Sequence, residues 1–166
     1  LIELGHRRIG FIAGHPDHSS SGARQAGFEQ ALSEHNIKLP KKLFHQGYFD
    51  CESGRSAATK MLQDSHPPTA IFACNDNMAA GVIQVAHGLN IDVPRDLSVT
   101  GFDDAPICEL TWPELSTIRQ PIEELAQKAT ALLLDELSKK PAAHAEEALH
   151  CSLVIRSSTG PAPKKP

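Results

Sequence analysis

Three polar side chains, Asn75, Asp76 and Asn77, directly follow one of the most apolar segments of the chain. Residues 70–74 read AIFAC, and a helix-prone segment begins at Met78. A carboxylate accepts hydrogen bonds from hydroxyl groups, whereas an amide both donates and accepts them. Where a buried strand meets a helix, such groups either cap the helix or bind a ligand. Asp76 and Asn77 are both candidates for the cap.

Polar or aromatic groups also follow three other apolar segments. They are the loop HPDHSSSGAR at 15–24, the triplet Tyr48-Phe49-Asp50 and the triplet Phe102-Asp103-Asp104. In a parallel α/β sheet the carboxyl ends of the strands meet at one edge, where ligands bind. Carboxylate, amide, guanidinium and aromatic groups together suit a sugar or a similar polyol, because its ring carries vicinal hydroxyls and apolar faces.

Each of these residues also has a purely structural interpretation. Asp103 and Asp104 can form a turn pair or an acid–base pair, although adjacent residues at a strand end point apart. Arg24 alone would be a surface residue, Phe49 alone a core residue, and Trp112 an interface or core residue. Only the shared place at the strand ends favours a ligand site.

Signatures of catalysis and of metal binding do not occur in the sequence. It contains no GxSxG, Walker A, GxGxxG or HExxH motif. The densest group of potential metal ligands, His15-Pro16-Asp17-His18, has no i, i+4 pair and no repeated spacing. We therefore expect no catalytic residues, no metal site and no cofactor.

Apolar segments and helical patterns alternate along the first 104 residues. Strands are expected at 9–14, 43–49, 69–74 and 97–102, and helices at 23–32, 52–65 and 77–89. Strands that are continuously apolar, rather than alternating, indicate a parallel sheet covered on both faces. The pattern predicts an α/β fold, a flavodoxin-like three-layer sandwich.

The pattern changes after residue 104. A long connection that contains Trp112 leads to a short strand at 116–120 and then to an amphipathic helix at 121–139. The apolar stripe of this helix consists of Ile122, Leu125, Ala126, Ala129, Leu132, Leu133 and Leu137. A last strand is expected at 151–156.

The first residues, LIELG at 1–5, have the pattern of the last turn of an amphipathic helix closed by Gly5. Neither an initiator Met nor the start of that helix precedes them in this sequence. We therefore expect the chain to be a fragment of a longer protein.

The composition is that of a globular domain without a basic surface. Of 166 residues, 40% are apolar and 22% are charged, and the formal net charge is −4, which argues against a nucleic-acid-binding face. No apolar run reaches the roughly 20 residues that cross a membrane. The four cysteines show no CxxC spacing, and Cys74 and Cys151 lie in apolar runs, where we expect buried free thiols. A reducing, cytoplasmic location is the resulting expectation.

Five segments, in this order and spacing, resemble the effector-binding core of the lactose/galactose repressor (LacI/GalR) family of bacterial transcriptional regulators. They are LIELGHRRIGFIAG, ARQAGFEQAL, PTAIFACNDNMAAG, DVPRDLSVTGFDD and PELSTIRQPIEELA, and the resemblance extends from Leu1 to about Thr159. It implies a lobe of the type I periplasmic-binding-protein-like fold. It also implies a non-enzymatic repressor whose N-terminal helix-turn-helix domain is missing from this chain.

The resemblance assigns the parts of the chain to two lobes. Residues 1–5 would end a truncated crossover helix, 6–118 would form the C-terminal lobe of the core, and 119–144 would be a crossover strand and helix that belong to the N-terminal lobe. Residues 145–159 would return to the C-terminal lobe, and 160–166 would be a disordered tail.

Carried over position by position, the resemblance implies effector contacts by Ser20, Arg24, Phe49, Asn75, Asp103 and Gln120. With Asn75 as a ligand group, Asp76 or Asn77 would begin the helix. Family members bind sugars, nucleosides or purines in a cleft between two lobes. The effector changes the orientation of the lobes and thereby the binding of operator DNA by the headpieces, a coupling typically of about 1–3 kcal/mol.

The family also forms homodimers through its core. The resemblance places this interface on the helix that starts near Met78 and on the loop 105–113. The contacts that it implies are Met78, Val82, Trp112 and Pro113.

Two other functions stay open on the sequence. A secreted sugar-binding receptor of a transporter shares the two-lobe architecture, although the unpaired cysteines and the motifs GHRRIGFI and TIRQP favour the regulator. A small flavodoxin-like enzyme would need a catalytic group that the sequence does not offer.

Overall fold

The computed structural model describes residues 1–138 and 149–164. The strands are β1 (Ile9–Ala13), β2 (Phe44–Gln46), β3 (Ala70–Ala73), β4 (Ser98–Thr100), β5 (Thr117–Arg119) and β6 (Ser152–Val154). The helices are α1 (Ser19–Glu34), α2 (Cys51–Leu62), α3 (Asp76–Gly88), α4 (Ile107–Leu110) and α5 (Ile122–Leu137), with a 3₁₀ helix, η1, at Lys41–Leu43. Every predicted strand and helix is present within a few residues, whereas α4 and η1 were not predicted. The parts of the predictions that fall on 139–148 and 165–166 lie outside the described residues.

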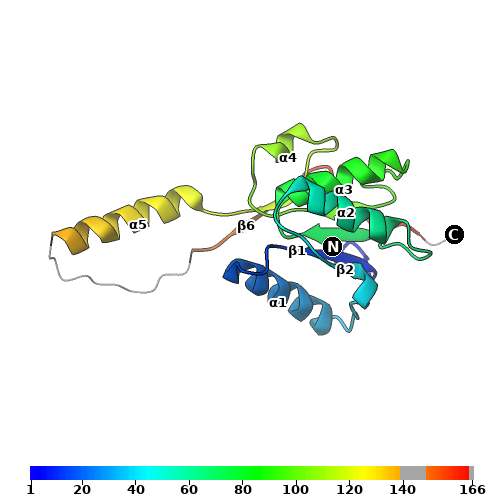
Figure 1. The fold of residues 1–166 in the computed structure, drawn as a ribbon, viewed down its shortest axis with the longest axis horizontal. Coiled ribbons are helices and arrows are strands. Elements are labelled where there is room, and N and C mark those ends of the chain that lie inside the picture. The colour runs from blue at the N-terminus through cyan, green and yellow to red at the C-terminus, as the bar shows by residue number, and fades with distance from the viewer. Residues whose placement is uncertain (139–148, 165–166) are drawn as a thin grey trace.

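A four-stranded parallel sheet in the order β2-β1-β3-β4 forms the centre of the fold. Phe11 of β1 is in register with Phe44 of β2 and with Phe72 of β3. One face of the sheet is covered by α1, and the other is covered by α2 and α3 (Figure 1). The expected three-layer α/β sandwich with parallel strands is therefore confirmed.

The core holds β1 and α3 firmly in place. All five residues of β1 are buried, and the Phe11 ring stacks on Phe28 of α1 with the ring centroids 4.6 Å apart. On the other face, α2 approaches α3 so closely that a Cβ on Gly54 would collide with the backbone of Met78. The strand ends and the start of α3 are thus rigid supports for side chains.

The segment that contains β5 runs parallel to β4 and to the residues after it, and two isolated bridges join them. The Gly101 N–H donates to the Ser116 carbonyl at 3.0 Å, and the Asp103 N–H donates to the Ile118 carbonyl at 2.9 Å. From there β5 pairs in antiparallel orientation with β6. These two strands are the connections between the sheet and α5.

Helix α5 extends away from the rest of the described chain (Figure 1). None of its residues is buried, and Leu125, Leu133 and Leu137 of its apolar stripe are 53%, 57% and 72% exposed. Within residues 1–138 and 149–164, no helix has the length and apolar character that a membrane crossing requires.

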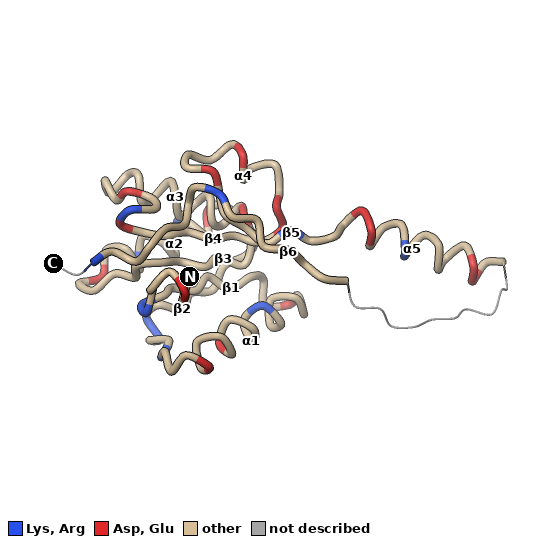
Figure 2. Tube along the Cα trace, turned by 180° about the vertical axis from the view of Figure 1, so that it is seen from behind, with Lys and Arg blue, Asp and Glu red and all other residues tan. Residues whose placement is uncertain are grey.

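Charged residues are spread over the molecule (Figure 2). Segments of lysine and arginine and segments of aspartate and glutamate both occur along the described trace. The formal net charge of −4 does not favour binding to DNA.

The residues expected at a dimer interface lie mostly inside the chain. Met78 and Val82 are 0% exposed, because α3 packs against α2, α4 and the sheet, and Pro113 is buried as well. Trp112 is 82% exposed. Of the four residues, Trp112 alone is open to a partner in this structure, and the assignment of Met78, Val82 and Pro113 to an interface stays a prediction that their burial does not support.

The cysteine prediction holds for one residue of two. Cys74 is buried, as expected, whereas Cys151, also expected to be buried, is exposed. The reason is that β6, which follows Cys151 directly, forms a separate two-stranded sheet with β5, and its first two residues are exposed as well.

The N-terminal residues have the geometry of a helix end. Gly5 has φ +94°, its N–H donates to the Ile2 carbonyl at 3.0 Å, and the His6 N–H donates to the Leu1 carbonyl at 3.1 Å. This pair of hydrogen bonds is characteristic of a helix closed by glycine.

The other end of the chain is held against the sheet. The Gly160 N–H donates to Ser98 Oγ at 3.1 Å, and the Ala162 N–H donates to the Leu4 carbonyl at 2.8 Å. The expectation of a disordered tail is wrong for residues 160–162, because these hydrogen bonds fix the backbone.

Candidate ligand-binding site

The guanidinium of Arg24 joins two strand ends that are far apart in sequence. Its Nη1 donates to the Cys74 carbonyl oxygen, 2.5 Å away, directly after β3. Its Nη2 lies 3.4 Å from Asp103 Oδ1, in the loop after β4. The Arg24 side chain is only 14% exposed, so these contacts are largely shielded from water and from salt.

Asp103 is the acceptor at the centre of this group. Gln120 Nε2 donates to Asp103 Oδ1 at 2.6 Å, and Arg24 approaches the same oxygen. Partial burial raises the pKa of the Asp103 carboxyl, while the charge of Arg24 and the hydrogen bond from Gln120 oppose that rise. The backbone of Asp103 has φ +118°, so the loop rather than a regular strand sets the direction of its side chain.

Two phenylalanine rings flank the guanidinium. The guanidinium carbon of Arg24 is 3.8 Å from the centroid of the Phe102 ring and 5.8 Å from that of Phe49. The shorter contact is a stacked cation–π arrangement. One face of Phe102 is therefore covered, whereas Phe49 is partly buried, and the packing of Phe49 against an effector stays a prediction.

Phe49 is held in an unusual position. Its backbone has φ +66°, and its carbonyl oxygen accepts a hydrogen bond from Asn75 Nδ2 at 2.9 Å. The ring lies over Gly14 at the end of β1, where a Cβ would collide with it. The end of one strand and the cap of a helix together place this ring.

Asn75 is the N-cap of α3, so the expectation that Asp76 or Asn77 caps the helix is wrong. Asn75 Oδ1 accepts a hydrogen bond from the Met78 N–H at 3.0 Å, and its side-chain amide donates to Phe49. Both ends of this buried side chain are thus engaged within the chain. A contact between Asn75 and an effector stays a prediction.

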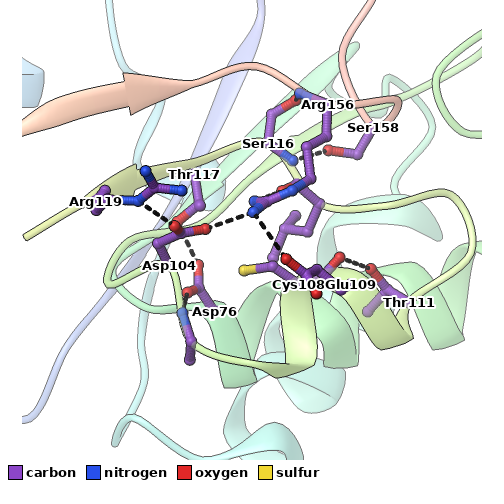
Figure 3. Close-up of polar contacts among 12 residues, drawn as sticks. Asp76, Asp104, Cys108, Glu109, Thr111, Ser116, Thr117, Arg119, Arg156 and Ser158 are labelled. Carbon is purple, nitrogen blue, oxygen red and sulfur yellow. Dashed lines mark hydrogen bonds and ion pairs between the residues drawn. The ribbon is translucent and has the colours of Figure 1, made fainter.

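Asp76 has a structural role behind the site. Its carboxylate is buried, Oδ1 accepts from Thr117 Oγ1 at 2.5 Å, and Oδ2 accepts from the Ala105 N–H at 2.8 Å (Figure 3). These bonds tie the first residue of α3 to β5 and to the loop after β4. This link could not be predicted from the sequence, because the partners lie 29 and 41 residues beyond Asp76.

Ser20 lies in the first turn of α1 and is exposed. It precedes Arg24 by four residues, and such positions share one side of a helix. The structure therefore places Ser20 on the Arg24 side of α1, and its contact with an effector stays a prediction.

Three further rings pack beside one another next to Phe49, in contacts that the sequence does not predict. The His18 ring lies 5.5 Å from Phe49, and the His15 ring lies 5.2 Å from His18 and 5.6 Å from Tyr48. The loop at 15–24 and the triplet around Phe49 were both recognised as strand ends. No spacing rule shows which of their side chains meet, because that depends on the path of each loop.

Two hollows border the cluster of Arg24, Asp103 and Gln120. One, of about 650 Å³, is lined by Asp103, Asp104, Arg119, Gln120, Pro121, Ile122, Glu123, Glu124 and Gln127. The other, of about 570 Å³, runs between α1 and the sheet, with Arg24 and Phe102 together with apolar residues such as Phe28 and Phe72 in its lining. The arrangement suits a molecule with hydroxyl groups on one part and an apolar face on another.

The site offers hydrogen bonds rather than an activated nucleophile. Burial raises the pKa of the Cys74 thiol to about 11, so this thiol stays protonated and unreactive at neutral pH. Arg24, Gln120 and Asp103 already bind one another, which is the geometry of a preformed recognition site.

Comparison with known proteins gives one family over most of the chain. A family profile described as periplasmic binding protein-like domain matches residues 1–159. The HTH-type transcriptional repressor PurR of Yersinia enterocolitica is 41% identical over 163 residues, which are 98% of this chain and 48% of that protein. The chain spans about half the length of the curated relatives that it matches.

Solved structures of related regulators have the same fold. A complex of the transcriptional regulator CelR with cellobiose superposes with a TM-score of 0.89 at 30% identity, over 95% of this chain and 48% of that one. A dimeric Lac repressor with a C-terminal deletion superposes with a TM-score of 0.90 at 30% identity, over 97% of this chain and 58% of that one.

Proposed function

The chain belongs to the family of periplasmic binding protein-like domains and, within it, to the LacI/GalR regulators, and we propose that it binds the effector of a DNA-binding transcriptional repressor. The observation that carries this proposal is the convergence of Arg24 and Gln120 on Asp103 Oδ1 beside the Phe49 ring. Carboxylate, amide and guanidinium groups around an aromatic face form a binding site for a polar ring compound.

The effector that we propose is an uncharged sugar or nucleoside. The opposite charges of Arg24 and Asp103 lie 3.4 Å apart, so this pair offers no excess charge to attract an ion. Hydroxyl groups can donate to Asp103 and accept from Arg24, while an apolar ring face packs against Phe49. The related CelR regulator is seen with cellobiose, which supports a sugar.

We place the operator-binding headpiece outside this chain and the protein in the cytoplasm. The exposed stripe of α5 supports a second lobe that packs against this helix, with the effector between the two lobes. The similarity to a dimeric Lac repressor supports a homodimer that forms through the core. Binding, and not catalysis, is the function, and a transport receptor is disfavoured because the relatives are transcriptional regulators by name.

Calorimetry on the intact regulator tests this function. A panel of D-glucose, D-galactose, D-ribose, cellobiose, adenosine and hypoxanthine should contain at least one compound that binds. Asp103→Asn should weaken that binding by about ten- to a hundredfold, because a hydrogen bond to a charged group contributes about 1.5–3 kcal/mol. It should leave the affinity for operator DNA unchanged.

Asp96→Asn is the matched control, because it removes an exposed carboxylate that pairs with Arg95 far from the site. Wild-type effector affinity in Asp103→Asn, or failure of every sugar and nucleoside to bind, would overturn the proposal.

A further inference from the structure

Asp104 is the neighbour of Asp103, the predicted effector contact. Its carboxylate forms ion pairs with two arginines. Arg119 Nε donates to Asp104 Oδ2 at 2.5 Å, and Arg156 Nη2 lies 2.8 Å from Asp104 Oδ1 (Figure 3). Arg119 is the last residue of β5, and Arg156 follows the end of β6 by two residues. One carboxylate therefore holds both strands that connect the sheet to α5.

The ion pair of Asp104 with Arg156 is shielded from water, whereas the pair with Arg119 is partly open to it. The side chains of Asp104 and Arg156 are 9% and 12% exposed, and that of Arg119 is 58% exposed. Although burial acts to raise the pKa of Asp104, the hydrogen bonds and charges of the two arginines hold it below its ordinary value. Asp104 is thus ionised at neutral pH, and loss of either arginine would leave its largely buried charge with one partner instead of two.

Arg156 is itself fixed by further contacts. Its Nη1 donates to the Leu115 carbonyl at 2.9 Å, and its backbone N–H donates to Ser116 Oγ at 2.9 Å. Glu109 of α4 lies 3.8 Å from its Nη2. The chain after β6 is therefore anchored to the residues that lead into β5.

Two consecutive aspartates, Asp103 and Asp104, contact two consecutive residues at the end of β5, Gln120 and Arg119. Asp103 accepts from Gln120 at the site, and Asp104 accepts from Arg119, the residue before Gln120. Both aspartates have positive φ, +118° and +58°, which lets consecutive carboxylates reach different partners. A shift of β5 would disturb the hydrogen bond to Asp103 and the ion pair with Asp104 together.

We propose that Asp104 is a positioning residue that fixes β5 and the chain after β6, and thereby sets the place of Gln120 in the site and the direction in which α5 leaves the body. The proposal rests on the proposed function only in taking Asp103 and Gln120 as effector contacts. It implies that occupancy of the site and the orientation of α5 are coupled through one carboxylate.

Hydrogen exchange in the absence of any effector tests the positioning of the strands. In Asp104→Asn, a residue type that tolerates φ near +58°, the amides of Thr117–Arg119, Gln120 and Ser152–Val154 should exchange at least about tenfold faster than in the wild type. The amides of β1 and β3 should keep their wild-type rates. A merely structural loss of stability would instead speed exchange across the whole sheet.

Two variants keep the test decisive. Asp96→Asn, which removes an exposed carboxylate next to Arg95, should leave the exchange of β5 and β6 unchanged. If Asp104→Asn does not fold, Arg119→Gln serves in its place, because this side chain is 58% exposed. Uniform acceleration, or no acceleration in β5 and β6, would overturn the proposal.

A second measurement separates this inference from the proposed function. For any panel compound that binds the intact regulator, Asp104→Asn should lower the affinity while Asp103 is intact. Unchanged affinity together with unchanged exchange sinks the inference and leaves the effector site standing. Faster exchange of β5 and β6 without binding of any sugar or nucleoside sinks the proposed function and leaves the positioning role standing.

Discussion

Arg24 stacks on Phe102, with its guanidinium carbon 3.8 Å from the centroid of the ring. The same guanidinium donates to the Cys74 carbonyl and faces Asp103. A planar fork can stack and donate in its plane at the same time, whereas the ammonium of lysine is a point charge on a flexible stem. The site therefore depends on arginine at this position and not only on a positive charge.

Arg24→Lys should weaken effector binding by about ten- to a hundredfold and lower the free energy of unfolding by about 1–2 kcal/mol, because it removes the stacking contact and one of the two directed hydrogen bonds. Calorimetry with the panel compound that binds, and urea unfolding, measure the two effects. The control is Arg95→Lys, since that side chain is 73% exposed and pairs only with neighbouring aspartates. Full affinity in Arg24→Lys would show that charge alone is sufficient.

The fold could be predicted because its signals are local. Residues 9–13 are apolar without interruption and become a strand buried on both faces, and the stripe of 122–137 becomes an exposed amphipathic helix. The places of the site could be predicted for the same reason, since polar groups interrupt apolar runs at Asn75 and Asp103.

The partners of each polar group could not be predicted. Asn75, Asp76 and Asn77 are all good caps, and the carboxylate of Asp76 instead accepts hydrogen bonds from Ala105 and from Thr117, which lies 41 residues beyond Asp76. Burial of Met78 likewise depends on the packing of α3 against both α2 and the sheet, which a pattern of small and apolar residues does not reveal.

The bond between Thr117 and Asp76 predicts a stability effect. Thr117→Val keeps the shape of the side chain but removes the hydroxyl that donates to a fully buried carboxylate. The free energy of unfolding, measured with urea, should fall by about 1.5–3 kcal/mol. Thr130→Val is the control, because that hydroxyl bonds only to the Ala126 carbonyl on the exposed surface of α5. Equal losses in both variants would contradict a special role for the buried pair.

A buried histidine predicts the pH dependence of stability. His6 is 0% exposed, its Nδ1 lies 2.9 Å from Thr69 Oγ1, and its Nε2 lies 3.0 Å from both Ser98 Oγ and the Gly160 carbonyl. Burial lowers the pKa of His6 from its ordinary value of 6.5, against the hydrogen bond to Gly160. Below pH 6.5 the unfolded chain therefore binds more protons than the folded chain, so this contribution is complete above that pH and is lost as the pH falls.

Urea unfolding at pH 7.5 and at pH 5.5 measures this effect. The wild type should lose stability over this interval with a slope of at most about 1.4 kcal/mol per pH unit from one proton. His6→Gln should be less stable at pH 7.5 but should lose less on acidification. His87→Gln, changed at an exposed position of α3, should keep the wild-type dependence. A His6→Gln curve parallel to the wild type would assign the pH dependence to another group.

We predict that the dimer interface involves α4 and Trp112, which lies two residues after the end of α4. Leu110 and Trp112 are each 82% exposed, and tryptophan is one of the residue types enriched at the hot spots of interfaces. Trp112→Ser should weaken self-association by at least about tenfold in sedimentation equilibrium. The only tryptophan of the chain also supplies a direct signal, because its emission should shift to shorter wavelength as the wild type is concentrated.

Leu137→Ser distinguishes the two exposed apolar surfaces, since this residue is 72% exposed on α5. If Leu137→Ser rather than Trp112→Ser dissociates the assembly, and the tryptophan emission does not change with concentration, then the copies meet through α5 and not through α4.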